Sequence, residues 1–373
     1  MSDESVDFEA AGLLNGLEGE ARAARSELLQ FLHREGVPLE ELKQAVSENR
    51  LALLPAERVL AYEAKYTLTE AAERASIPVE FLVRQRRAAG LTIPPPDELA
   101  FSERDADAMR LLAEALAAGI PPDTLVEAGR VFGEAAARVA GASRSLVAES
   151  FVQPGDSESE VGFRLAEAAR RLFPHTAPTL QYLYESHLRE QLRSDVVESV
   201  SLAAGRVPGT RTVAVCFADL VGFTRLGQEL PPDELGSLAT RLSTLASSVV
   251  HSPASLVKTI GDAAMLVSTE PGPLLDTTLD LLKAAEAEGD EFPALRAGVA
   301  IGDALNRWGD WYGAPVNVAS RVTDVARPGS VLATGDVRRA SADSYKWSFA
   351  GRRRLKGVRR EIGLYRCRRI DSG

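Results

Sequence analysis

Apolar positions in the first two hundred residues recur with the period of an α-helix. Leu28, Leu29 and Leu32 lie three and four residues apart, and the same spacing returns at 111–116. Glycine or proline interrupts the pattern at 36–38, 94–96, 120–122 and Pro174. This pattern predicts several short helices packed as one bundle-like, all-α domain over residues 1–200.

The pattern changes near residue 211, where strands begin to alternate with helices. The stretch 201–210 contains two glycines and a proline, which predicts a linker. Beyond it we predict strands at 211–218, 255–260, 262–268, 294–301 and 330–334, helices at 231–252, 273–289 and 314–326, and a final antiparallel pair at 346–354 and 361–368. The βαββαβ order predicts an α+β domain with a ferredoxin-like core over 211–373, so the fold class is multidomain.

Composition narrows the class of protein. The 373 residues carry a net charge of −10, which argues against a general nucleic-acid binder and makes nucleic acid an unlikely partner. No apolar stretch approaches the length of a membrane span, and the acidic N-terminus lacks a secretory signal, so we expect a cytoplasmic protein. Cys216 and Cys367 lie in strand-like runs and are expected to be buried thiols.

One helical stretch, at 66–91, resembles a helix-turn-helix of the MerR type. Its second helix would carry Arg84, Arg86 and Arg87, and the functional interpretation is contact with DNA. The alternative is a helical pair that serves packing or regulation. We favour this alternative, because the acidic surroundings would repel phosphates.

Two carboxylates follow predicted strands of the second domain. Asp219 ends the apolar run that begins at 212, and Asp262 follows the predicted strand 255–260. In the predicted topology the first and third strands are antiparallel neighbours, so the end of one lies beside the start of the other. Asp219 and Asp262 are therefore expected at adjacent strand tips, where they can hold Mg²⁺ on a nucleoside triphosphate.

Two further groups suit the same substrate. The backbone N–H groups of the loop that includes Gly222, Phe223 and Thr224 can face phosphate oxygens. Asn317 and Arg321 are four residues apart on a predicted helix and share one face, which suits a sugar oxygen beside a phosphate. A helix cap and a surface arginine are the alternative for this second pair.

Three segments carry a family resemblance: FADLVGFT at 217–224, KTIGDA at 258–263 and GDWYGAPVNVASR at 309–321. Together they resemble the class III nucleotidyl cyclases over roughly 211–368. The helical N-terminal half is similar to the regulatory domain of the pH-responsive, autoinhibited mycobacterial-type adenylate cyclases. The resemblance implies two divalent metal ions per site, Mg²⁺ or Mn²⁺, held by Asp219, Asp262 and the backbone of Leu220.

The resemblance also implies roles for four other residues. It implies that Lys258 and Asp310 bind the base, that Asn317 orients the ribose and that Arg321 stabilises charge on the α-phosphate. It implies a homodimer whose two active sites cross the interface, with the metal pair from one protomer and these four residues from the other. Asp310 is expected in the turn that precedes the helix bearing Asn317.

Other residues of the sequence bear on contacts with the outer phosphates and on the choice of base. Lys356 and Arg307 are candidates for the outer phosphates, and a solvated surface charge is the alternative for each. Asp310 can accept a hydrogen bond from the adenine amino group and Lys258 can donate one to the neighbouring ring nitrogen, whereas guanine reverses both. The sequence therefore favours ATP as the substrate.

We accordingly expect a regulated adenylate cyclase that converts ATP to 3′,5′-cyclic AMP and pyrophosphate, autoinhibited by its N-terminal domain. The alternatives are a catalytically silent, cyclase-like dimer that senses nucleotide, and a DNA-binding regulator. His187, on the last predicted helix of the N-terminal domain (180–197), is a candidate pH sensor, and a surface histidine without such a role is the alternative. A fatty acid or other lipid in the helical domain is a second candidate signal.

Overall fold

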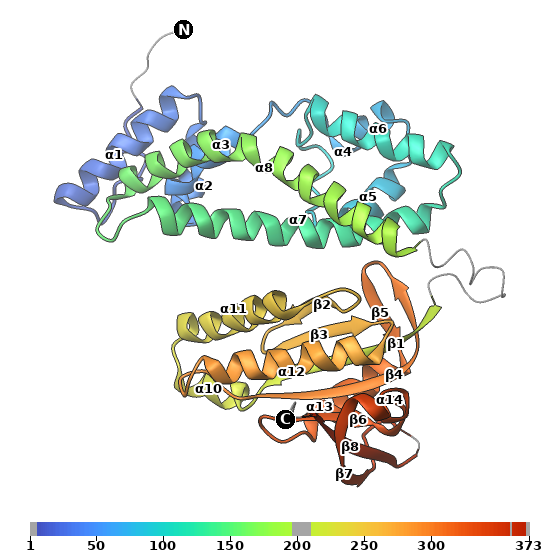
Figure 1. Ribbon diagram of the computed structural model, residues 1–373. Coiled ribbons are helices and arrows are strands. Elements are labelled where there is room, and N and C mark those ends of the chain that lie inside the picture. The colour runs from blue at the N-terminus through green and yellow to red at the C-terminus, as the bar shows by residue number, and fades with distance from the viewer. Residues whose placement is uncertain (1–5, 196–209, 359, 371–373) are drawn as a thin grey trace. The chain divides into compact units, whose positions relative to one another are not determined.

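The computed structural model describes residues 6–195, 210–358 and 360–370. The chain divides into two compact units, Met1–Ser194 and Asp195–Gly373 (Figure 1). The predicted linker at 201–210 lies outside the described residues except for its last position. The last two residues of the predicted helix 180–197 lie outside them too.

The first unit is helical, as predicted. Its elements are α1 (Gly19–Arg34), α2 (Leu39–Ser47), a short 3-10 turn (Leu51–Leu53), α3 (Leu54–Leu60), α4 (Leu68–Arg74), α5 (Val79–Ala88), α6 (Glu103–Ala117), α7 (Pro122–Phe151) and α8 (Glu158–Asp195). The prediction of short helices with a break at Pro174 was wrong, because α8 has 38 residues and continues through Pro174 and Pro178. A proline removes only one helical hydrogen bond. The same helix buries Ala166, Ala168 and Ala169, which all precede the first of these prolines.

The apolar core of this unit consists of two separate clusters. Leu28, Leu29 and Leu32 of α1 are fully buried in the first cluster, which also receives Phe163 from α8. The second forms around α4, α5 and α6 and receives Val126 from α7. The long helices therefore contribute side chains to two small cores, where a single bundle core was expected.

The helix-turn-helix stretch is packed within this unit. A side chain at Gly133 of α7 would approach the carbonyl oxygen of Ala89 to 2.3 Å, so α5 and α7 lie in close contact. Arg84 forms an ion pair with Asp123. Arg86 donates to the Thr92 carbonyl oxygen at 2.9 Å, and burial lowers its pKa. These contacts favour the packing interpretation of α5 over the DNA-binding one.

The second unit is built on one mixed sheet. Its strands are β1 (Thr210–Leu220), β2 (Ser255–Ile260), β3 (Ala263–Ser268), β4 (Leu295–Arg307), β5 (Asp310–Gly313), β6 (Val331–Thr334), β7 (Tyr345–Arg353) and β8 (Ile362–Arg369). They are ordered β2-β3-β1-β4-β6-β8-β7, and β5 pairs with β4. The order β2-β3-β1-β4, with β1 antiparallel to both neighbours, is the ferredoxin-like arrangement, which confirms the predicted fold class.

Successive residues of β1 face two helical layers. Ala214, Cys216 and Ala218 pack with α11 (Pro232–Val249) and α12 (Pro271–Ala287), while Val213 and Val215 pack on the side of α13 (Ala314–Asp324). Helix α13 lies so close to β4 that a side chain at Gly298 would meet the Thr323 nitrogen at 2.3 Å. The sheet therefore has helices on both faces, and α13 is held tightly against it.

The two cysteines are buried and free, as predicted, and burial raises the pKa of each thiol to about 12. Within the described residues, no helix is both long and apolar enough to cross a membrane.

Three elements were not predicted: α10 (Phe223–Glu229), α14 (Gly335–Ala340) and the hairpin of β4 with β5. Trp308 and Gly309 have φ values of 56° and 77°. Positive φ at both central residues of a two-residue loop is typical of a type I′ turn, which lets β4 fold back into β5. Asp310 is therefore the first residue of a strand, and its predicted place in a turn was wrong.

Candidate active site

Two carboxylates meet at one edge of the sheet. Asp219 lies near the end of β1 and is paired in register with Ala263, the first residue of β3. The Leu220 amide donates to the Asp262 carbonyl oxygen at 2.9 Å, which holds the loop before β3 against the end of β1. The structure thus brings Asp219 and Asp262 together at adjacent strand tips.

Burial and charged neighbours act in opposite directions on the Asp219 carboxyl. Burial raises the pKa of the half-buried Asp219 carboxyl, and the nearby Asp262 raises it further, while a hydrogen bond from Arg296 opposes both. Two carboxylates held together in this way form a site that a divalent cation would stabilise. Within the described residues, no group of three or more His, Cys, Asp or Glu side chains is arranged to hold a metal ion by itself.

Arg296 is a residue of this site that the sequence analysis missed. It lies on β4 directly opposite Asp219, and its Nε and Nη2 donate to Asp219 Oδ2 at 2.9 and 2.6 Å. Its Nη1 donates to the carbonyl oxygen of Asp324 at the end of α13, at 3.0 Å. The pairing register of β1 with β4 would have identified it. The guanidinium is therefore a counter-cation of the Asp219 carboxylate.

A second charged pair lies on other elements of the same unit. Lys258 of β2 forms an ion pair with Asp310 Oδ2, and the Trp311 amide donates to Asp310 Oδ1 at 2.9 Å. The side chains are 36% and 28% exposed, so both remain accessible to a ligand. The β4–β5 hairpin therefore fixes a hydrogen-bond acceptor beside a donor.

Helix α13 presents the third group. Asn317 and Arg321 are both exposed, and Arg321 Nη1 lies 3.1 Å from Asp324 Oδ2. Thr323 Oγ1 donates to the Phe217 carbonyl oxygen at 3.0 Å, which ties the helix to β1. Asn317 and Arg321 thus stand on a helix of fixed position, and one of them has a carboxylate neighbour.

The loop after β1 turns directly into α10. Gly222 has φ of 80°, a left-handed conformation that favours glycine, and it precedes Phe223 and Thr224 in the first turn of the helix. The first amides of a helix have no partner within the helix, so this turn presents donors. Leu220 uses its own amide in the contact with Asp262.

The remaining candidate residues are exposed. Arg307 lies at the end of β4, in register with Asp310, and Lys356 lies in a turn after β7. His187 is on the surface of α8, with its Nδ1 at 3.9 Å from Glu190 Oε2. Among these three, only Arg307 is connected by register to one of the charged pairs described above.

Comparison with known proteins assigns both halves of the chain. Residues 6–192 match the family described as adenylate cyclase regulatory domain, and residues 206–367 match the adenylate and guanylate cyclase catalytic domain. A pH-sensitive adenylate cyclase of Mycobacterium tuberculosis is 39% identical, over 98% of this chain and 93% of that protein. An adenylate cyclase of Streptomyces griseus is 32% identical, over 78% of this chain and 71% of its own length.

A crystal structure of the adenylyl cyclase CyaB from P. aeruginosa is 21% identical and covers 44% of this chain and 96% of that chain, with a TM-score of 0.37. The two family matches together cover most of the chain, and the mycobacterial relative matches 98% of it. The chain belongs to the class III adenylate cyclases, with an N-terminal regulatory region and a C-terminal catalytic domain.

Proposed function

We propose that this member of the adenylate cyclase family converts ATP to 3′,5′-cyclic AMP and pyrophosphate. The observation that carries the proposal is the ion pair of Lys258 with Asp310, which holds a donor and an acceptor side by side. Adenine needs that arrangement, because it offers an amino donor next to an acceptor nitrogen. Guanine would leave both charges mispaired, and a site with unpaired polar groups discriminates strongly.

Asp219 and Asp262, with the backbone of Leu220, would hold two divalent ions, Mg²⁺ or Mn²⁺. When bound, these ions would lower the pKa of the ribose 3′-hydroxyl and neutralise the leaving pyrophosphate oxygens. Burial and the nearby Asp262 raise the pKa of Asp219, which supports this assignment, because a divalent ion would stabilise the charged form of this carboxylate. Both metals accept oxygen ligands, so the donor set does not select between them.

The other residues would bind and orient ATP so that its 3′-hydroxyl faces its own α-phosphate. Asn317 would hold the ribose, and Arg321 would donate to the α-phosphate oxygens as charge develops there. A single such donor contributes about 3 to 4 kcal/mol to transition-state stabilisation. Amides of the first turn of α10, with Lys356 and Arg307, would contact the outer phosphates. Positioning and electrostatics would then carry most of the rate acceleration.

The proposed active form is a homodimer with two composite sites. One protomer would supply the carboxylate pair, and its partner would supply Lys258, Asp310, Asn317 and Arg321. The apolar side chains of Ile260 and Tyr312 are more than half exposed beside Asp262 and Asp310, respectively, where an isologous interface would cover them.

Complementation tests this arrangement. Asp219→Ala and Asn317→Ala protomers are each expected to be inactive, and a mixture of them should regain activity through one intact composite site. Persistent inactivity of the mixture, with heterodimers demonstrated by native mass spectrometry, would contradict the shared-site arrangement.

The N-terminal region, residues 1–200, would inhibit the catalytic domain, residues 211–373, until a signal arrives. Acidic pH is one proposed signal, acting through His187 or other titratable groups, since one relative is named for pH sensitivity. A chain that begins near Arg206 is expected to differ from the full-length protein in specific activity or pH profile. Superimposable profiles would rule out an inhibitory N-terminal region.

A fatty acid is the second proposed signal. A cavity of about 210 Å³ in the first unit is lined by Phe31, Leu32, Pro55 and Val59, and by three charged residues, Glu35, Arg58 and Arg170. Apolar walls with two guanidinium groups suit part of an acyl chain with its carboxylate. Addition of oleate to the full-length enzyme, compared with the chain that begins near Arg206, tests this proposal through the rate of cyclic AMP production.

One assay tests the central proposal. Purified full-length protein is incubated with ATP or GTP and with Mg²⁺ or Mn²⁺ across pH 5 to 8, and the products are separated by chromatography. The expected result is cyclic AMP from ATP, with GTP turned over far more slowly. Comparable production of cyclic GMP would contradict the base assignment, and no cyclic nucleotide under any condition would contradict the activity. ATP as substrate is consistent with the expected cytoplasmic location.

A further inference from the structure

Charge is strongly segregated along the chain. The last 47 residues, 327–373, contain thirteen Lys and Arg against four Asp and Glu, a net charge of +9. The rest of the chain therefore carries a net charge of −19. The net charge of −10 for the whole chain conceals this basic region. In the structure this region forms β6, α14, β7 and β8 at one edge of the sheet (Figure 1). A local surface can thus have the opposite charge to the whole molecule.

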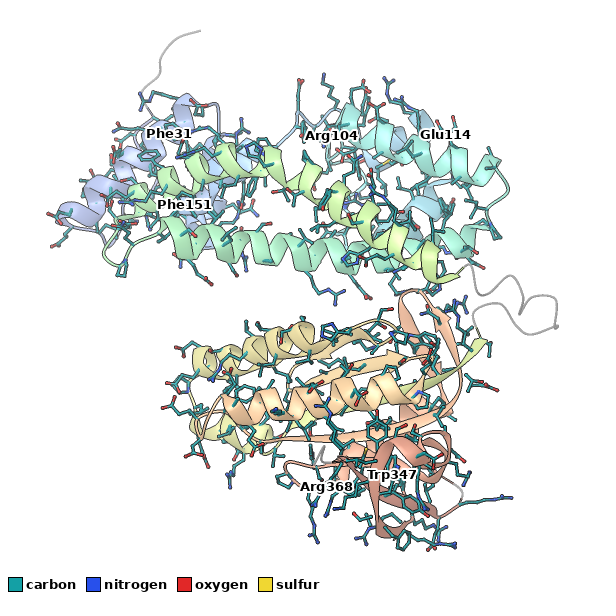
Figure 2. The ribbon with its side chains drawn as sticks, in the orientation of Figure 1. Phe31, Arg104, Glu114, Phe151, Trp347 and Arg368 are labelled. Carbon is teal, nitrogen blue, oxygen red and sulfur yellow. The ribbon has the colours of Figure 1, made fainter. Side chains whose placement is uncertain are left out.

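Most of these cations have no acidic partner. Within the described residues, ion pairs involve only Arg339, with Asp336, and Arg369, with Asp276 and Asp280. On one face of the β7–β8 ribbon, Lys346 lies directly opposite Arg368, a like-charged cross-strand pair that destabilises a sheet. Figure 2 labels Arg368 and Trp347 on these two strands. An anion bound at this edge would offset the unpaired charge.

The opposite face of the same ribbon carries an aromatic pair. Phe349 of β7 is 62% exposed and lies in register with Tyr365 of β8, with their ring centroids 5.4 Å apart. The guanidinium of Arg338, from α14, lies over the Tyr365 ring at 4.5 Å. Arg352 is in register with Gly363, two residues from Tyr365, so it lies on the same face. Two rings and two guanidinium groups thus form one surface, which we call the arginine–aromatic surface.

We propose that the arginine–aromatic surface binds single-stranded nucleic acid. Unpaired bases stack on exposed aromatic rings and on guanidinium planes, and arginine donates hydrogen bonds to the intervening phosphates. A duplex hides its base faces and cannot use the rings in this way. This site shares no residue with the proposed cyclase site, and the inference does not depend on the cyclase activity.

A membrane surface is the competing anionic partner, and the geometry disfavours it. Insertion below lipid headgroups requires apolar side chains on one continuous amphipathic face. Phe349 lies within a strand and packs against Tyr365, with Arg338 over the Tyr365 ring and Arg352 on the same face, which is the arrangement of a stacking platform. Acidic groups elsewhere in the chain do not prevent binding, since charges beyond about 8 Å are largely screened at physiological salt.

Fluorescence anisotropy with the full-length chain tests the proposal. The probes are labelled ten-nucleotide single-stranded RNA and DNA of mixed sequence, the same DNA as a duplex, and phosphatidylserine vesicles by sedimentation. Saturable binding of the single strands is expected at 50 mM salt and should weaken steeply at 200 mM. Phe349→Ala should weaken it by about five- to 150-fold, the range measured for loss of one stacked base.

Two variants serve as controls. Phe349→Trp keeps a ring and should retain binding, while Phe132→Ala removes an aromatic side chain that is 65% exposed on α7 and should change nothing. Cyclic AMP production by Phe349→Ala should equal that of the wild type. The proposal is overturned if single strands do not bind, if duplex binds as tightly, if vesicles bind in their place, or if Phe132→Ala weakens binding as much as Phe349→Ala.

Discussion

The catalytic unit contains two charged pairs that differ in sign and in what they require. Asp219 and Asp262 are like-charged and held together by the backbone, whereas Lys258 and Asp310 are oppositely charged and bind each other. In the first pair Asp262 raises the pKa of Asp219, and hydrogen bonds from Arg296 offset part of that repulsion. The second is complete by itself and is preorganised for its ligand. One domain therefore contains a like-charged pair that the backbone holds together and an oppositely charged pair whose members attract each other.

Removal of the Asp219 carboxylate should have the largest effect on activity. Asp219→Ala is expected to lower cyclic AMP production by at least about a thousandfold, because water cannot replace the carboxylate that we propose to hold both ions. Mg²⁺ should raise the melting temperature of the wild type and not that of the variant. Activity and thermal unfolding, each with and without Mg²⁺, are the measurements.

The control for this prediction is Asp303→Ala. Asp303 is a carboxylate on β4 whose side chain, among the described residues, bonds only Thr212, so its loss should leave both readouts unchanged. Residual activity of Asp219→Ala within tenfold of the wild type would remove the metal role from Asp219.

Inverting the attractive pair should change the substrate while leaving catalysis possible. Lys258→Glu combined with Asp310→Cys replaces a donor by an acceptor and an acceptor by a small side chain, which suits guanine. We expect kcat/KM for ATP to fall by about a hundred- to a thousandfold, and the ratio of GTP to ATP turnover to rise. Steady-state kinetics with both nucleotides measure this. An unchanged nucleotide ratio would show that these residues do not read the base.

The sequence predicted the carboxylate pair, and topology explains why. Adjacent antiparallel strands must bring the end of one beside the start of the next, so Asp219 and Asp262 could be placed together from the order of elements alone. The ion pair of Lys258 with Asp310 within one chain could not be deduced, because it depends on the β4–β5 hairpin, which the strand pattern did not disclose. Arg296 needed an exact register between β1 and β4, and periodicity does not provide one.

In the helical unit, a proline in the sequence did not identify the end of a helix. Pro174 predicted a helix end, but α8 continues through it and through Pro178. The same sequence pattern did predict the buried positions of α1, where Leu28, Leu29 and Leu32 are fully covered. The periodicity of apolar residues thus identified which side chains of α1 are buried. It did not predict the length of α8.

A stability measurement separates the two pairs without reference to activity. In metal-free protein, Asp262→Asn should raise the free energy of unfolding by on the order of 1 kcal/mol, because it removes the negative charge that opposes ionisation of Asp219. Asp310→Asn should lower it, by at most about 1 kcal/mol, because the Lys258–Asp310 pair is attractive but partly exposed. Urea unfolding monitored by circular dichroism, in EDTA, gives both values.

Excess Mg²⁺ should reverse the first difference, since the wild type gains stability from binding and the variant gains less. Destabilisation by Asp262→Asn in EDTA would show that the carboxylates do not repel each other in the folded state.

The smallest effect is expected at a third pair, Arg321 with Asp324, which extends the comparison to exposed charges. The side chains are 46% and 53% exposed, and such a pair three residues apart on a helix is worth about 0.3 to 0.5 kcal/mol. Asp324→Asn should therefore lower kcat only about twofold, by letting Arg321 leave its position more often, with KM for ATP unchanged. The matched control is Asp336→Asn, which breaks a similar pair with Arg339 on α14 and should not alter kcat. A tenfold loss at Asp324 would mean that attraction between exposed groups positions Arg321 far more firmly than solvent screening allows, and an equal loss at Asp336 would mean that the effect is not specific to Arg321.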